Sequence, residues 1–215
     1  MKLINLTIFT LTLLIGGISL HYLKPLITRN GTSVITAPIA SGKVGGTQLT
    51  IKIPSNMTQK QLELLNYAFD VAKSDGHKVP QYVQGIIMQE SKAGNMKDFR
   101  VAGLTNRVGD HYFGIAQVKL STAKSVMSRY PSLWEGFDTH TDEELQARLI
   151  TDDKFNIRVA SKLLLMLNIN ENPESAITAY NLGEGGAQGI ANKKEFHYNV
   201  GVKNNMNKLK KVLTN

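Results

Sequence analysis

The 215-residue chain contains no cysteine. Disulfide bonds, thiolate metal sites and lipid-modified cysteines are therefore excluded. The five histidines show no paired metal-ligand spacing and no His-Glu-x-x-His motif, so the sequence predicts no metal site and no cofactor. Gly-x-Ser-x-Gly is absent as well, and the Gly-Glu-Gly-Gly run at 183–186 is not a phosphate loop because no Lys-Ser/Thr pair follows it. The sequence thus lacks the common zinc, nucleotide and serine-nucleophile signatures.

Acidic residues are missing from the first 55 residues, which carry five of the 25 Lys and Arg. Residues 56–215 therefore hold 20 basic and all 17 acidic groups, a balance of +3 within a net charge of +8. This mild excess does not predict a nucleic-acid-binding surface. It suits an anionic cell-wall polymer, and ordinary solubility explains it equally well.

The N-terminal segment 3–23 contains no Asp, Glu, Lys or Arg and is mostly apolar. About 20 such residues are enough for a helix to cross a bilayer, so we expect a membrane-spanning helix here. Lys2 precedes the segment as in a signal sequence, but no small-x-small cleavage site closes it. Residues 1–24 are therefore interpreted as an uncleaved signal anchor, with a cleaved signal peptide as the alternative. Residues 25–56, rich in Thr, Ser, Gly and Pro, are interpreted as a linker.

A helical pattern begins near Thr58 and continues to the end of the chain. Capping-box signatures start at Thr58 and Thr141, and apolar residues then recur at helical spacing. No alternating run predicts a strand, and no repeat is visible. We therefore expect a mainly α domain over residues 57–215. Its helices are predicted at about 58–76, 80–91, 121–129, 141–150, 152–167, 173–180 and 195–213.

Glu90 is the carboxylate whose context points to chemistry. It lies in the last turn of an apolar helix, and Gly94 and a polar loop follow it. A carboxyl that emerges from an apolar surface into a cleft is partly desolvated, which raises its pKa and keeps it protonated near neutral pH. A general acid for glycosidic cleavage needs that property. A glutamate at a helix end is more often simply solvated, so this position does not decide the matter alone.

Three short motifs place Glu90 in a wider pattern. They are Gln89-Glu90-Ser91, Tyr-Phe-Gly-Ile-Ala-Gln-Val at 112–118, and Ala-Tyr-Asn at 179–181. Together, in this order and across about residues 80–205, they resemble the soluble-type lytic transglycosylases, which show Glu-Ser, Gly-Leu-Met-Gln and Ala-Tyr-Asn. Tyr198 is the candidate for the tyrosine that this family carries in its final helix. Ala116 departs from the pattern, because the family has Met there.

The resemblance implies a lysozyme-like α domain that cleaves peptidoglycan between N-acetylmuramic acid and N-acetylglucosamine. Glu90 would protonate the linking oxygen and then, as a carboxylate, take a proton from the C6 hydroxyl. That oxygen would close a 1,6-anhydro ring with help from the acetamido group. The residues expected to bind substrate or orient Glu90 are Ser91, Gln117, Tyr180, Asn181 and Tyr198. Alternative roles are a helix-end hydrogen bond for Ser91 and core packing for the two tyrosines.

The implied partners are peptidoglycan strands and, through the N-terminal helix, a membrane. An anchored or exported protein facing the cell wall follows, used by a phage or by a secretion or conjugation machine. Two alternatives stay open. Asp98 or Asp110 could activate water and make the protein a hydrolytic muramidase, as in goose-type lysozyme, or the chain could be a wall-binding module without catalysis.

Overall fold

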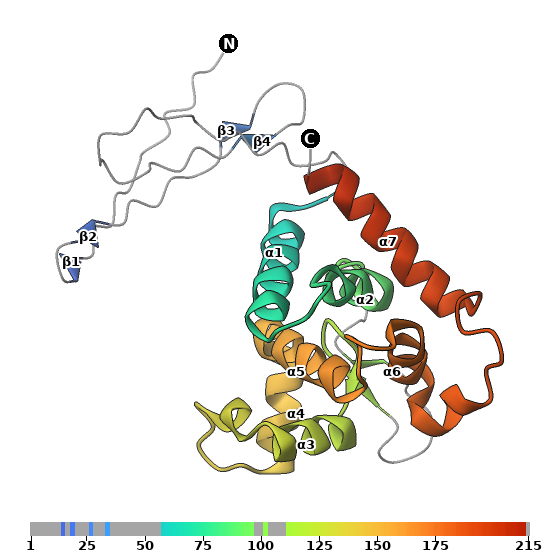
Figure 1. The fold of residues 1–215 in the computed structure, drawn as a ribbon. Helices are drawn as coiled ribbons and strands as arrows, with labels where there is room; N and C mark the ends of the chain where they lie inside the picture. Colours follow the sequence, from blue (N-terminus) through green and yellow to red (C-terminus); the bar gives the residue numbers. More distant parts are fainter. Residues whose placement is uncertain are drawn as a thin grey trace. The chain divides into compact units, whose positions relative to one another are not determined.

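The structure is a computed structural model that describes residues 57–96 and 111–213, together with short strands at 14–15, 18–19, 26–27, 33–34 and 101–102 (Figure 1). Residues 1–56 and 57–215 form two separate compact units. In the first unit, β1 (Leu14–Ile15) pairs antiparallel with β2 (Ile18–Ser19), and β3 (Leu26–Ile27) pairs antiparallel with β4 (Ser33–Val34).

The predicted anchor helix at 3–23 lies mostly outside the described residues. Its four described residues belong to β1 and β2, so the helix prediction is wrong at these positions. In the sequence only Gly16 and Gly17 separate the two strands, and a Gly-Gly link favours a hairpin over a continuous helix. Across the part of the chain that the structure describes, no helix has both the length and the hydropathy needed to cross a bilayer.

The second unit is mainly helical, as predicted. Its helices are α1 (Gln59–Ser74), α2 (Gln81–Ser91), α3 (Leu120–Arg129), α4 (Asp142–Thr151), α5 (Asp153–Met166), α6 (Pro173–Gln188) and α7 (His197–Leu213), with a short 3-10 helix, η1 (Pro131–Trp134). Most bounds agree with the sequence analysis within a few residues. α6 is the exception, because it continues to Gln188 across a break at Gly183 (φ 74°, ψ 163°) instead of ending near Tyr180.

Local capping explains why α1 begins where it does. Gln61 N–H donates to Thr58 Oγ1 at 3.2 Å, and Thr58 N–H donates to Gln61 Oε1 at 2.8 Å. This reciprocal pair is the predicted capping box, and it satisfies two backbone donors that the helix itself leaves without partners. Thr141 likewise accepts from the Glu144 N–H at 3.2 Å and starts α4.

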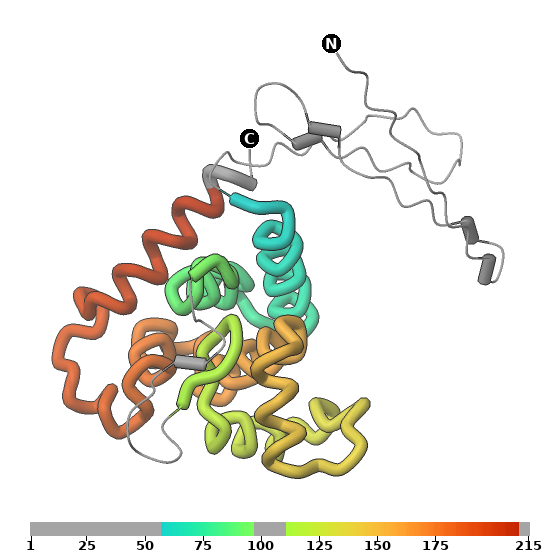
Figure 2. Tube along the Cα trace, turned by 180° about the vertical axis from the view of Figure 1, so that it is seen from behind, coloured from blue at the N-terminus to red at the C-terminus, as the bar shows by residue number. Residues whose placement is uncertain are grey.

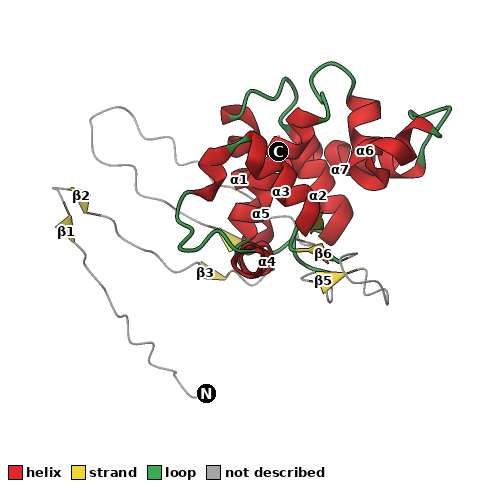
Figure 3. Cartoon of the chain, turned by 90° about the horizontal axis from the view of Figure 1, so that it is seen from below, coloured by secondary structure: helices red, strands yellow, loops and turns green. Residues whose placement is uncertain are grey.

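A three-stranded antiparallel sheet, in the order β5 (Val101–Ala102), β6 (Tyr112–Phe113) and β7 (Val118–Lys119), was missed by the sequence analysis; Figure 3 labels β5 and β6 of this sheet. Each strand has two residues, too few for an alternating pattern to show. In β6 and β7, Tyr112 pairs with Lys119 and Phe113 pairs with Val118, so the turn between them is held as a hairpin.

Helix α5 runs through the middle of the helical unit and contacts α1, α2, α3, α4 and α6. Its Phe155, Ile157, Val159 and Leu164 are at most 1% exposed. Helix α2 lies between α1 and α7, as the opposite views of Figures 1 and 2 both show. The helix that carries Glu90 is therefore covered on two sides.

His77, just after α1, is buried and forms a polar contact with α5. Its Nε2 lies 3.1 Å from Ser161 Oγ, which in turn donates to Asp75 Oδ2 at 2.6 Å. His77 Nδ1 is buried with no hydrogen-bond partner among the described residues. Protonating this nitrogen in the fold would leave a buried N–H without an acceptor. Burial accordingly lowers the pKa of His77 below its ordinary 6.5.

This lowered pKa predicts a loss of stability in acid. A base whose pKa is depressed by folding contributes stability that is present above pH 6.5 and is lost as the pH falls through its folded pKa. We expect urea denaturation between pH 8 and 5 to show a smaller decrease in unfolding free energy for His77→Gln than for wild type. His197→Gln, at an exposed histidine, is the matched control and should follow wild type. An equal decrease in all three proteins would contradict the assignment.

Candidate active site

Glu90 lies at the close contact between α2 and α7. Two glycines allow the helices to approach: a Cβ added to Gly85 would lie 2.8 Å from Met206 Cγ, and one added to Gly201 would lie 2.5 Å from Gln89 Oε1. Along this contact, residue numbers rise in α7 as they fall in α2. The start of α7 therefore faces the end of α2, which brings Tyr198 to Glu90.

The end of α2 is held by its own backbone and by α1. Lys92 and Ala93 have left-handed backbones (φ 50° and 53°), and the Ala93 N–H donates to Ile87 O at 3.2 Å. Such a reversal ends a helix. From α1, the Gln61 side-chain amide donates to Lys92 O at 2.7 Å. Helix α2 therefore stops directly after Ser91, with the Glu90 carboxyl fixed in its final turn.

The Glu90 carboxyl is shielded and bonded to one hydroxyl, since Tyr198 Oη donates to Glu90 Oε1. Burial raises the pKa of Glu90 from 4.5 to about 7, and the Tyr198 hydrogen bond lowers it by a smaller amount. Desolvation disfavours the ionised form, whereas the hydroxyl stabilises it, and here desolvation is the larger effect. Near neutral pH, about half of these carboxyls carry a proton.

Tyr180, from α6, lies close enough to Glu90 for charge to couple them. Its Oη donates to Ala116 O at 2.7 Å. Burial, and then the charge of Glu90, raise the pKa of Tyr180 well above its ordinary value. The pKa of Tyr198 is also raised well above its ordinary value, by burial first, then by the charge of Glu90, and less by Tyr180 and by the hydrogen bond to Glu90. Both hydroxyls therefore keep their protons at neutral pH and act as hydrogen-bond donors.

A pocket of about 390 Å³ opens beside Tyr180. It lies between the β6–β7 hairpin, the start of α3, the end of α5 and α6, and its volume is within the range of small-molecule sites. Polar and apolar side chains share its wall, among them Gln117, Lys119, Thr122, Leu163, Met166, Asn181 and Glu184. Tyr180 lines the pocket and also couples to Glu90, so it links the carboxyl to the pocket.

The structure brings five of the six predicted site residues into this arrangement. Glu90, Tyr180 and Tyr198 form one group, and Gln117 and Asn181 line the pocket with Tyr180. Glu90, Tyr198 and the sixth residue, Ser91, are not among the residues that line the pocket.

Ser91 is fully buried and so has no exposed surface for direct contact with substrate, whereas its other predicted role, to orient Glu90, stays a prediction. Its Oγ donates to Ile115 O at 2.7 Å and accepts the Gly94 N–H at 3.0 Å. This matches the alternative of a helix-end hydrogen bond, because a short hydroxyl in the last turn reaches backbone more easily than solvent. Asp98 and Asp110, considered for water activation, lie outside the described residues.

Asn156 was not among the site residues predicted from the sequence. This α5 residue is fully buried, and its side-chain amide binds the backbone of the 113–116 segment and of α4. Its one signal in the sequence was a polar residue between Phe155 and Ile157, both apolar. Asparagine is rarely buried unless its amide is satisfied, so that position was informative.

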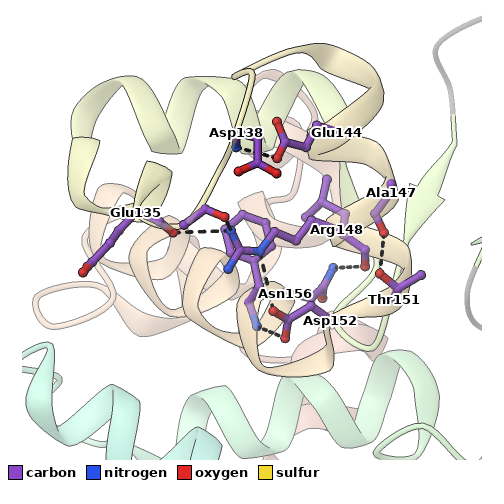
Figure 4. A network of polar contacts seen from close by, with 11 residues as sticks. Glu135, Asp138, Glu144, Ala147, Arg148, Thr151, Asp152 and Asn156 are labelled. Atoms are coloured by element: carbon purple, nitrogen blue, oxygen red, sulfur yellow. Dashed lines mark hydrogen bonds and ion pairs between the residues drawn. The ribbon is translucent and has the colours of Figure 1, made fainter.

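A second polar network, at the junction of α4 and α5, has a structural role (Figure 4). The Glu144 carboxylate accepts the Thr139 Oγ1–H at 2.7 Å and the N–H groups of Asp138 and Thr139 at 2.8 Å. These bonds, the Thr139 hydroxyl first, lower the pKa of Glu144 to about 2. Nearby, Arg148 Nε pairs with Asp152 at 3.6 Å. Glu144 is thus ionised at neutral pH and cannot serve as a general acid there.

Comparison with known proteins identified no relative of this chain. Protein-family models, curated proteins and solved structures each gave no match to this chain.

Proposed function

We propose that this chain is a peptidoglycan lytic transglycosylase that cleaves the bond between N-acetylmuramic acid and N-acetylglucosamine and leaves 1,6-anhydro ends. The observation that carries the proposal is the shielded Glu90 carboxyl, whose pKa is raised to about 7. It is held by Tyr198 and coupled to Tyr180, and Tyr180 also lines the pocket. Perturbed carboxyls beside pockets are typical of catalytic acids.

One carboxyl with a pKa near 7 suits both steps of this reaction. In the first, Glu90 gives its proton to the glycosidic oxygen as the bond to the anomeric carbon breaks. The Tyr198 hydroxyl then stabilises the new carboxylate by donating to it. In the second, the carboxylate takes the proton of the C6 hydroxyl while that oxygen bonds to the anomeric carbon. A group whose pKa lies near the working pH gives and takes a proton with similar ease.

The pocket has the chemistry to hold an N-acetylated sugar. The amide of Asn181 offers donors and an acceptor for hydroxyl and acetamido groups, and Gln117, whose Nε2 donates to Gly114 O at 2.7 Å, lines the same wall. Leu163 and Met166 add apolar wall that can contact the carbon face of a sugar ring. Such a combination of apolar wall and a few directed polar groups is usual for ligand sites.

The described surroundings of Glu90 fit a reaction in which one carboxyl serves in both steps. Glycosidases of the ordinary type use two carboxyl groups, about 5–10 Å apart, one of which activates water or attacks the sugar. Within the described part of the chain, no second carboxylate perturbs the pKa of Glu90. A mechanism in which one carboxyl serves twice needs no such partner.

The products of wall digestion test this function. Full-length protein incubated with purified peptidoglycan sacculi is expected to release muropeptides with anhydro ends, detected by mass spectrometry. Each is lighter by one water than the product of hydrolysis, which serves as the reference after digestion with a muramidase. Release of reducing ends would support the hydrolytic alternative instead. Intact sacculi after prolonged incubation would contradict an enzymatic function.

The proposed substrate also suggests where the protein works. The protein would be exported or held at the cell envelope, and residues 25–56 would let the domain reach the wall. Peptidoglycan strands are then the partner, and a phage lysis or secretion machine is the proposed user.

A further inference from the structure

The turn between β6 and β7 carries two groups of the site. Gln117 lines the pocket, and the carbonyl of Ala116 accepts the Tyr180 hydroxyl at 2.7 Å. Two of the turn's residues, Gly114 (φ 69°) and Gln117 (φ 51°), have left-handed backbones. For a residue other than glycine this conformation costs free energy and persists when its surroundings impose it. Within the turn, the Gln117 N–H and Nε2 donate to Gly114 O at 3.2 and 2.7 Å, and contacts from outside the turn add to these.

Asn156 supplies those contacts from α5. Its Nδ2 donates to Phe113 O at 2.8 Å and to Leu149 O at 3.1 Å, and its Oδ1 accepts the Ala116 N–H at 2.8 Å. Two donors and one acceptor are matched to two carbonyls and one N–H. A carboxylate or an aliphatic side chain of similar size lacks this set of groups.

We propose that Asn156 is a positioning residue of this site: by holding the turn, it fixes the Ala116 carbonyl that anchors the Tyr180 hydroxyl near Glu90. Asn156 does not line the pocket and acts through Ala116 and Tyr180. Its consequence for catalysis rests on the proposed function, whereas its effect on the proton affinity of Glu90 does not.

Asn156 is expected to affect the pKa of Glu90 by limiting the access of water to its carboxyl. Tyr198 from α7 is the described titratable group that acts on the pKa of Glu90, and the charge of Glu90 in turn raises the pKa of Tyr180 from α6, so the two side chains lie near each other. If the turn loosens, Tyr180 loses the acceptor that holds its hydroxyl at Ala116. Water then reaches the carboxyl more easily, and hydration favours its ionised form. The pKa of Glu90 should therefore fall toward its ordinary value.

The decisive measurement is the pKa of Glu90 by carbon-13 NMR titration of full-length protein, with Glu90→Gln used to assign the signal. We expect about 7 in wild type. In Asn156→Ser we expect a value lower by about one unit, a tenfold weaker affinity for the proton. Asn156→Asp, which keeps the volume and loses the donors, is the second variant if the first does not fold. A folded variant with an unchanged Glu90 pKa would overturn the proposal.

Ser161→Ala is the matched control, because Ser161 is as buried as Asn156 on the same helix and bonds to Asp75 instead of the turn. It should lower stability without moving the pKa of Glu90. A shift as large as that of Asn156→Ser would mean a general structural effect and would contradict the proposal. In a Tyr180→Phe background, Asn156→Ser should shift the pKa of Glu90 little further, because the hydroxyl that Ala116 holds is already absent. If the double variant shows the sum of the two single shifts, the proposal is contradicted.

The pH dependence of wall lysis gives a second, independent measure of the pKa of Glu90. The alkaline limb of kcat/KM for wall lysis reports the pKa of the acid in the free enzyme. In Asn156→Ser this limb should move to lower pH by the same amount as the NMR value, and an unmoved limb would count against the positioning role. If wild type releases no muropeptides, the proposed function fails, and the NMR titration still decides the role of Asn156.

Discussion

Replacement of Glu90 by Gln is expected to lower the rate of wall lysis by about 10⁴-fold, the upper end of what general acid–base groups contribute. Gln has nearly the same shape but can neither give the proton to the glycosidic oxygen nor take one from the C6 hydroxyl. Since Glu90 serves in both steps, no other described group restores the reaction. The loss of turbidity of purified sacculi measures the rate. Lysis that persists within tenfold of wild type would remove Glu90 from the mechanism.

Binding to sacculi and the unfolding free energy test whether Glu90→Gln keeps the fold. Binding to sacculi should be unchanged, which separates an enzyme from a wall-binding module. The unfolding free energy at pH 8 should exceed that of wild type by about 2 kcal/mol, at 1.36 kcal/mol per pKa unit reduced for partial solvation. The sign follows from the raised pKa: the protonated carboxyl stabilises the fold below pH 4.5, and this contribution is lost as the pH rises through 7. At pH 5 the two proteins should differ little.

Glu184→Gln is the matched control for lysis. Glu184 also lines the pocket, but its side chain is exposed on α6 beyond the break at Gly183. Removal of its charge should change kcat/KM by no more than a few-fold. An effect as large as that of Glu90→Gln would mean that the acid has been assigned to the wrong carboxyl.

Gly114→Ala is expected to lower the unfolding free energy by about 3 kcal/mol or more, in the range of severely destabilising substitutions. A Cβ at Gly114 would overlap the Leu149 carbonyl oxygen and lie 2.5 Å from Asn156 Nδ2. It would push apart the buried hydrogen bonds of Asn156, and groups left without partners are costly. The left-handed backbone of Gly114 adds strain for alanine. Urea denaturation at neutral pH measures the loss.

Substitutions at two other glycines separate the cost of backbone strain from the cost of steric overlap. Gly76 has a left-handed backbone (φ 89°) with nothing within 4 Å of an added Cβ, so Gly76→Ala should show the cost of backbone strain alone, about 1 kcal/mol. Gly185, inside α6, has neither strain nor a close neighbour, so Gly185→Ala should be neutral or slightly stabilising. If Gly114→Ala costs no more than Gly76→Ala, the close packing around the turn is not as described.

Local signals in the chain were enough to predict most of the helices of residues 57–215 and one catalytic candidate. Caps such as the pair Thr58 and Gln61 and a 3.6-residue apolar period act within a few residues, so they can be read without knowing the fold. The same local context, an apolar helix ending in a polar loop, marked Glu90. The motifs that contain Gln117, Tyr180, Asn181 and Tyr198 were also visible in the sequence.

Contacts between residues far apart in the chain determined the pKa of Glu90, the direction in which Ser91 faces and the role of Asn156. The pKa of Glu90 depends on α7 covering α2, and 108 positions separate Glu90 from the tyrosine that binds it. Ser91 faces the turn and not the pocket because α2 sits against Ile115, which no local pattern shows. Asn156 is 40 residues from the Ala116 N–H it accepts. Sequence periodicity reports which face of an element is apolar, but burial, pairing and proton affinity belong to the assembled fold.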